Sequence, residues 1–136
     1  MRIILVSFYN RFDEYPTKYS LGVLRIAAYL SKNQEIDISI IPYNLDVVSS
    51  LDEVVGVIKE EKPLIVGLPA YVWTWETVMN ISQRISDSQC LIVVGGPEVQ
   101  NHADKDLGND KVFICGDGEL FWDNLVKEMM GGASKE

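Results

Sequence analysis

Two glycine-rich segments and one aromatic segment follow buried strands that we expect in this chain. The glycine-rich segments are residues 95–98 (GGPE) and 116–119 (GDGE), and the aromatic segment is 69–75 (PAYVWTW). Glycine permits positive φ and lets a backbone approach a ligand closely. Free N–H groups at the start of a helix suit an anion or a polar ligand edge, and aromatic rings stack on flat molecules. The pattern therefore favours non-covalent binding of a flat ligand over acid–base catalysis.

Each of these segments also has a purely structural interpretation. The paired glycines are explained equally by a tight turn, and the carboxylates of Asp117 and Glu119 by capping of the following helix. The aromatic residues could form a hydrophobic cover over the end of the sheet. We expect Trp75 in the core and Tyr71 at the mouth of the site. Both interpretations stay open from sequence alone.

The segment between the first strand and the first helix, residues 8–20, is unusually long. Connections of this kind usually take about 2–6 residues, and long loops at strand ends are often functional. It carries three aromatic residues that we expect near a ligand, Tyr9, Phe12 and Tyr15. A self-packed surface loop is the alternative.

Hydrophobic periodicity predicts the strands and helices that position these segments. We expect strands at about 3–7, 36–41, 64–68, 91–94 and 112–114. Helices are expected at about 21–31, 51–61, 75–86 and 119–130, with a weaker helical stripe over 99–107. The second strand alternates apolar and polar residues, which is typical of a sheet edge, and the third is continuously apolar and so central. Ser49 or Ser50 and Thr74 are candidate helix N-caps, and Pro63 is expected to stop the second helix.

Strands that alternate with helices predict an α/β fold: one doubly wound five-stranded parallel sheet, flavodoxin-like or Rossmann-like, with strand order 2-1-3-4-5. In this architecture ligands bind beyond the carboxyl ends of the strands, near the switch between the first and third strands. We expect one domain over residues 1–132 and a frayed tail at 133–136.

Charge and composition exclude several classes of partner. The chain has 136 residues with a net charge of −8, and its Lys and Arg residues are scattered. Clustered basic residues would be needed for nucleic acid or an anionic membrane surface, so we expect neither partner. No apolar run approaches a membrane span of about 20 residues. The first residues lack a secretory signal pattern, so a cytoplasmic location is expected.

Familiar catalytic and metal motifs are missing. Cys90 and Cys115 are the only cysteines and His102 is the only histidine, so this chain cannot supply an iron–sulfur cluster or a multi-histidine metal site. There is no Walker loop. Gly116-x-Gly118-x-x-Phe121 matches only half of a dinucleotide fingerprint. We therefore expect no independent enzymatic activity.

Four pieces of the sequence form an ordered set: residues 21–30 (LGVLRIAAYL), 65–74 (IVGLPAYVWT), 92–98 (IVVGGPE) and 114–121 (ICGDGELF). Together they resemble the cobalamin-binding domain that precedes the catalytic domain in cobalamin-dependent radical SAM proteins. The resemblance implies a sheet edge that holds a corrinoid, here cobalamin, with its nucleotide tail between the strand-end loops. The residues expected at the cofactor are Tyr9, Phe12, Tyr15, Gly22, Ala70, Tyr71, Thr74, Gly95, Gly96, Pro97, Glu98, Gly116, Asp117, Gly118 and Glu119.

The sequence departs from related patterns at two places. The first loop lacks the Asp-x-His-x-x-Gly motif of methionine-synthase-like corrinoid proteins, so no histidine from it can ligate cobalt. This chain also lacks Cys-x-x-x-Cys-x-x-Cys, so a radical SAM domain is expected as a partner, whether this sequence is a fragment or a standalone relative. Two other functions stay open: a cofactor-free protein-interaction domain of the same fold, and a flavin-binding module.

Overall fold

The computed structural model describes residues 1–10, 20–86, 88–102, 111–114 and 118–131. Its five strands form one sheet in the order β2-β1-β3-β4-β5, and every neighbouring pair is parallel. The predicted flavodoxin-like order is thus confirmed. The strands are β1 (Arg2–Tyr9), β2 (Asp37–Asn44), β3 (Ile65–Pro69), β4 (Leu91–Gly95) and β5 (Lys111–Ile114).

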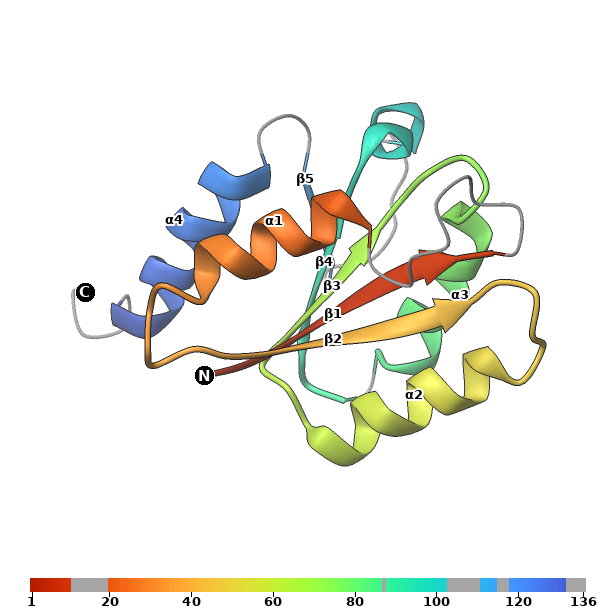
Figure 1. Ribbon diagram of the computed structural model, residues 1–136, viewed down its shortest axis with the longest axis horizontal. Helices are drawn as coiled ribbons and strands as arrows, with labels where there is room; N and C mark the ends of the chain where they lie inside the picture. The colour runs from red at the N-terminus through yellow and green to blue at the C-terminus, as the bar shows by residue number, and fades with distance from the viewer. Residues whose placement is uncertain (11–19, 87, 103–110, 115–117, 132–136) are drawn as a thin grey trace.

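Helices cover both faces of the sheet (Figure 1). The elements are α1 (Leu21–Leu30), α2 (Ser50–Glu61), α3 (Trp75–Arg84), the short 3₁₀ helix η1 (Pro97–His102) and α4 (Gly118–Gly131). Helices α1 and α4 pack on one face, which we call the α1/α4 face, and α2 and α3 pack on the other, the α2/α3 face. Because side chains alternate along a strand, successive residues of β3 and β4 enter different halves of the core.

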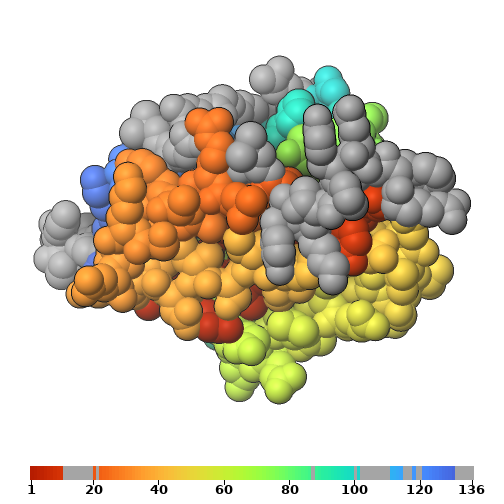
Figure 2. Space-filling view, viewed as in Figure 1, coloured from red at the N-terminus to blue at the C-terminus, as the bar shows by residue number. Residues whose placement is uncertain are grey.

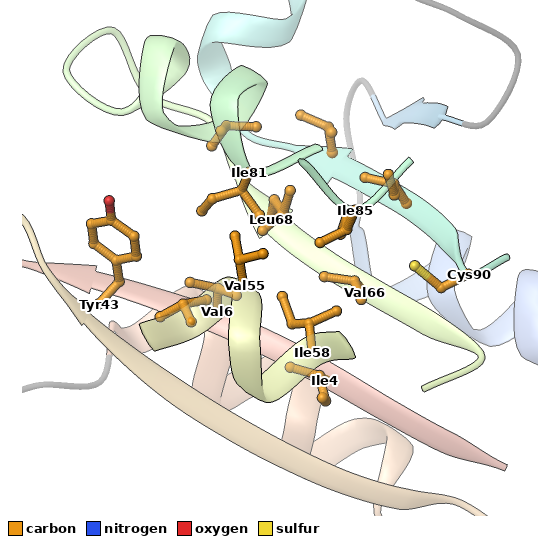
Figure 3. Packing of buried hydrophobic residues seen from close by; sticks show 14 of the residues in the cluster. Ile4, Val6, Tyr43, Val55, Ile58, Val66, Leu68, Ile81, Ile85 and Cys90 are labelled. Atoms are coloured by element: carbon orange, nitrogen blue, oxygen red, sulfur yellow. The ribbon is translucent and has the colours of Figure 1, made fainter. Parts of the chain in front are cut away.

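The α2/α3 face is filled by branched aliphatic side chains. Figure 3 shows Val55 and Ile58 of α2 and Ile81 of α3 directed toward Val66 and Leu68 of the sheet. All five are buried. Helix and strand periodicities agree here, because the apolar stripe of each helix meets the apolar residues of the strands.

The predicted positions of the second and third strands within the sheet are confirmed. β2 lies at the edge of the sheet, and Figure 2 shows it at the near surface between α1 and α2. Its first residue, Asp37, is exposed, whereas Ile65, Val66 and Leu68 of β3 are buried at the centre. The sheet therefore places the ends of β1 and β3 side by side, where the strand order reverses.

The ends of the elements follow local sequence signals only in part: Ser49 occupies the predicted N-cap of α2 but makes no side-chain capping hydrogen bond. Helix α2 stops as predicted: Lys62 adopts the left-handed conformation at φ 50°, and Pro63 follows. The helical stripe expected over 99–107 is a 3₁₀ helix where it is described, ending at His102, and 103–107 lie outside the described residues. The tail at 133–136 also lies outside them. Within the described part of the chain, no helix is long and apolar enough to cross a membrane.

Candidate functional site

Two glycines leave a hollow on the α1/α4 face of the sheet. In the parallel register, Gly67 of β3 lies between Leu5 and Val93, and Gly95 of β4 lies between Pro69 and Ile114. Each of these positions directs its side chain toward α1 and α4. Neither glycine adds a side chain to this face: atoms of Leu5 and Trp122 occupy the space at Gly67, whereas Gly95 leaves room for an ordinary contact with Ile114. A pocket of about 170 Å³ lies beside both glycines.

The pocket lies at the carboxyl end of the sheet, between the sheet and the first turns of two helices. Helix α1 contributes Gly22 and Ile26 to its wall, and α4 contributes Gly118 and Trp122. This is the strand-order reversal where open α/β sheets bind ligands. The complete described lining is Leu5, Gly22, Val23, Ile26, Gly67, Leu68, Pro69, Tyr71, Val93, Gly95, Gly96, Ile114, Gly118 and Trp122.

Gly67 and Trp122 shape the pocket together, although the sequence analysis assigned neither a role in the site. A Cβ at residue 67 would lie 2.6 Å from Leu5 Cδ2 and 2.9 Å from Trp122 Cζ2. The absence of a side chain at Gly67 therefore lets the indole ring lie against β3. The sequence signal was a glycine inside a continuously apolar strand, which often marks a close approach.

Gly96, directly after β4, is required by close contact with the backbone of the neighbouring loop. Gly96 has φ of 127°, and a Cβ there would lie 2.4 Å from the carbonyl oxygen of Ala70. The N–H of Ala70 donates to the carbonyl of Gly95 at 2.5 Å, and the N–H of Glu98 donates to the carbonyl of Ala70 at 3.2 Å. Gly96 thus adopts the positive φ that glycine permits, and the loops after β3 and β4 form one connected rim.

Thr74 holds the loop after β3, but not by capping α3 as predicted. It occupies the N-cap position, yet its side chain makes no capping hydrogen bond. Its hydroxyl instead accepts from the N–H of Tyr71 at 2.8 Å and donates to the carbonyl of Pro69 at 3.1 Å. Thr74 is fully buried, and its hydroxyl is directed at these loop groups rather than at the N–H groups of α3. Thr74 thus fixes the position of Tyr71 at the pocket.

The three aromatic residues of this loop divide between mouth and core. Tyr71 lines the pocket, and its ring stacks on that of Trp73 at 5.0 Å with 5° between the ring planes. Trp73 remains 65% exposed. Trp75 packs against the α2/α3 core, with its ring 6.3 Å from that of Phe113. The prediction that Trp75 belongs to the core and Tyr71 to the mouth is confirmed.

Two serines fix the start of α1 beside the pocket, a role that the sequence analysis did not assign. The N–H of Ser20 donates to Oγ of the fully buried Ser7 at 2.9 Å. Oγ of Ser20 accepts from the N–H of Val23 at 3.4 Å and caps the helix. The end of β1 is thereby tied to the first turn of α1, which carries Gly22 into the pocket wall.

The residues predicted at the cofactor fall into four groups. Those lining the pocket are Gly22, Tyr71, Gly95, Gly96 and Gly118, and those buried in the rim are Ala70 and Thr74. Those described but outside the pocket lining are Tyr9, Pro97 and Glu98. Those outside the described residues are Phe12, Tyr15, Gly116 and Asp117, while Glu119 has a described backbone in α4 but no described side chain.

The described lining carries little that could catalyse a reaction. Tyr71 supplies its only ionisable side chain. Burial raises the pKa of Tyr43, with a smaller contribution from Asp52, and the hydrogen bond that Lys127 donates to Asp123 raises the pKa of Lys127. Neither lines the pocket. No group of three or more His, Cys, Asp and Glu residues that could hold a metal ion occurs among the described residues. The arrangement suits binding of an apolar group rather than acid–base work.

Comparisons with known proteins agree with this fold. The model of the B12 binding domain family matches residues 15–126. The fold is similar to that of OxsB, a cobalamin-dependent S-adenosylmethionine radical enzyme, solved with aqua-cobalamin and S-adenosylmethionine bound: TM-score 0.71, 17% identity, covering 95% of this chain and 18% of that one. OxsB with aqua-cobalamin alone gives a TM-score of 0.74 at 16% identity, covering 95% of this chain and 19% of that one.

This chain therefore spans less than a fifth of the length of the OxsB chain. Comparison with curated proteins gives no significant match. At this level of identity the structural likeness establishes the fold. The family model covers most of the sequence, and all four motif pieces lie within the residues that it matches. The chain belongs to the B12 binding domain family.

Proposed function

We propose that this domain, over residues 1–132, binds cobalamin at the carboxyl edge of its sheet. The observation that carries the proposal is the pocket beneath α1 and α4, which Gly67 and Gly95 line without placing a side chain in it. In this proposal the lower base of the cofactor's nucleotide tail enters the pocket and the corrin ring lies over the rim. The cobalt chemistry would come from the cofactor, and the protein would bind and orient it.

The dimensions and chemistry of the pocket fit such a base. Its volume of about 170 Å³ compares with about 150 Å³ for an engineered apolar cavity that admits benzene. Leu5, Val93 and Trp122 present aliphatic and aromatic surface to it. A flat, mostly apolar ring would gain burial there without a polar partner.

Rim residues would hold the rest of the cofactor. Tyr71 and Trp73 offer aromatic surface beside the mouth, and the fixed backbone at Gly96 permits close approach. The first turn of α4, beginning at Gly118, offers N–H groups suited to the phosphate of the tail. We assign Thr74 a positioning role through Tyr71. Tyr9, Phe12, Tyr15, Ala70, Pro97, Glu98, Gly116, Asp117 and Glu119 remain proposed contacts of the corrinoid.

We further propose that the bound corrinoid serves a radical SAM catalytic domain, since the resembling OxsB chain belongs to an enzyme of that class. The two cysteines of this sequence cannot supply a radical SAM cluster motif. The catalytic step would therefore belong to that partner domain, and this domain would contribute the cofactor.

The test is retention of corrinoid by the purified chain. Hydroxocobalamin is mixed with the protein, the mixture is desalted, and the visible spectrum is compared with a control without protein. We expect close to one corrinoid per chain. A colourless protein fraction would contradict the proposal, and the same experiment with flavin mononucleotide tests the flavin hypothesis.

A pocket variant makes the test specific to the site. In Gly95→Ala the new Cβ would lie 3.7 Å from Ile114 Cβ, an ordinary contact, so the variant is expected to fold with a smaller pocket. Its affinity for hydroxocobalamin should fall about fivefold or more, as overpacking predicts. Gly56→Ala, on the exposed side of α2, is the control and should bind like the wild type.

A further inference from the structure

The described pocket lining offers almost no hydrogen-bonding side chain. Leu5, Val23, Ile26, Val93 and Trp122 present carbon atoms, while Tyr71 brings the only hydroxyl of the described lining and lies at the mouth. The indole N–H of Trp122 is the other side-chain donor of that lining, and the atoms of Trp122 nearest to Gly67 are Cζ2 and Cη2 of its benzo ring. The inner wall beside β3 is thus a hydrocarbon surface.

The backbone in the pocket floor is also engaged. Gly67 and Gly95 belong to the interior strands β3 and β4, each of which pairs with a strand on both sides. The carbonyl of Gly95 also accepts from the N–H of Ala70. Peptide groups within a sheet point along the sheet rather than out of its face. A ligand on the α1/α4 face therefore meets few free polar groups at the floor.

We propose that this pocket selects among corrinoids by their lower base, accepting benzimidazole or phenol-type bases and disfavouring purines. The inference rests on the proposed binding of a corrinoid. Adenine carries an exocyclic amine and several ring nitrogens that are hydrogen-bonded in water. In an apolar pocket some of these groups lose their partners, which costs affinity. Dimethylbenzimidazole and cresol expose mostly carbon and lose much less.

The expected discrimination is moderate. Unpaired polar groups in an apolar site weaken binding by about 10- to 100-fold. Apolar pockets rarely prefer an apolar ligand over its polar isostere by more than about 100-fold. The adenine corrinoid should thus bind about 10- to 100-fold more weakly than hydroxocobalamin.

The experiment compares three corrinoids on the wild-type chain by equilibrium dialysis: hydroxocobalamin, the analogue with adenine as lower base, and the analogue with cresol. Cresol has no nitrogen to bind cobalt, so it separates the apolarity of the base from the ease with which the base leaves cobalt. Tight binding of the first and third with weak binding of the second supports the inference. Equal affinity for adenine and cresol analogues overturns it, whereas failure of all three to bind refutes the proposed function instead.

A matched pair of variants assigns the discrimination to the pocket. Val93→Thr adds a hydroxyl at the pocket face of β4, and Val94→Thr adds one on the opposite face of the same strand. Both residues are buried, so both variants should lose comparable stability. Val93→Thr should narrow the preference against adenine about fivefold, and Val94→Thr should leave it unchanged. If both variants keep the wild-type preference against the adenine corrinoid, the pocket lining does not set that preference. If the variants fail to fold, the comparison of three corrinoids on the wild-type chain tests the inference.

Discussion

The same two central strands build a packed wall on one face and a hollow on the other. Toward α2 and α3, β3 and β4 present Val66, Leu68, Ile92 and Val94, all buried. Toward α1 and α4 they present Ile65, Gly67, Val93 and Gly95. Two of these four positions are glycine, and a pocket lies on this face where the helices begin. The α2/α3 face is thus a tightly packed core, whereas the α1/α4 face contains a pocket.

The largest expected effect is on the packed face. Ile81 of α3 is fully buried in the α2/α3 core. Ile81→Ala should reduce the free energy of unfolding by about 2–5 kcal/mol, because it removes three carbon atoms and leaves a cavity. Urea denaturation measures the loss. Val57→Ala, at a residue that is 38% exposed on α2, should change stability by no more than about 0.5 kcal/mol.

The same variant tests whether the faces are independent. Under conditions where Ile81→Ala is fully folded, its affinity for hydroxocobalamin should match the wild type, since the pocket lies across the sheet. Loss of binding by the folded variant would show that packing on one face determines the shape of the other.

A smaller effect is expected where the hollow meets its wall. Gly67→Ala should lower stability by about 1–3 kcal/mol, because the added methyl overlaps Leu5 and Trp122. Trp122→Phe removes the benzo atoms nearest to that methyl. Together the two changes should therefore cost less than the sum of the single changes, which a double-mutant cycle by urea denaturation measures. Additive costs would mean that Gly67 and Trp122 do not constrain each other.

The fold was accessible from sequence because its signals are repetitive. The alternation of Ile36, Ile38 and Ile40 marked an edge strand, and the unbroken apolar run at 64–68 marked a central one; both placements are confirmed. The expected position of a binding site followed from topology, since strand order fixes where the sheet reverses. The family resemblance implied Gly22, Tyr71, Gly95, Gly96 and Gly118 at the cofactor, and these residues line the pocket.

The inner pocket was not accessible in the same way, because it depends on residues far apart in sequence. Gly67 shapes the pocket through its close contact with Trp122, which lies 55 positions later in the sequence. No local sequence pattern predicts that contact. The Ser7–Ser20 hydrogen bond similarly joins the two ends of a long segment. Thr74 had the signature of a helix cap, but two closer backbone partners took its hydroxyl. Local propensity gave way to tertiary geometry at each of these positions.

The smallest effect separates stability from binding. Gly22 of α1 and Gly56 of α2 are exposed helical glycines, and a Cβ at either would meet no atom within 4 Å. Gly56→Ala should stabilise the protein by about 0.5–1 kcal/mol, because alanine has the higher helix propensity. The gain at Gly22→Ala should be smaller, since it lies in the first turn. Thermal unfolding measures both changes.

Only one of these two glycines lines the pocket. Gly22→Ala should therefore weaken hydroxocobalamin binding while leaving the apo protein at least as stable as the wild type, and Gly56→Ala should leave binding unchanged. A loss of affinity without a loss of stability cannot come from damage to the fold, so it would mean that the ligand needs the space beside α1. Equal affinities of the two variants for hydroxocobalamin would mean that the corrinoid does not contact the pocket wall at Gly22. The pocket on the α1/α4 face would then have no assigned ligand.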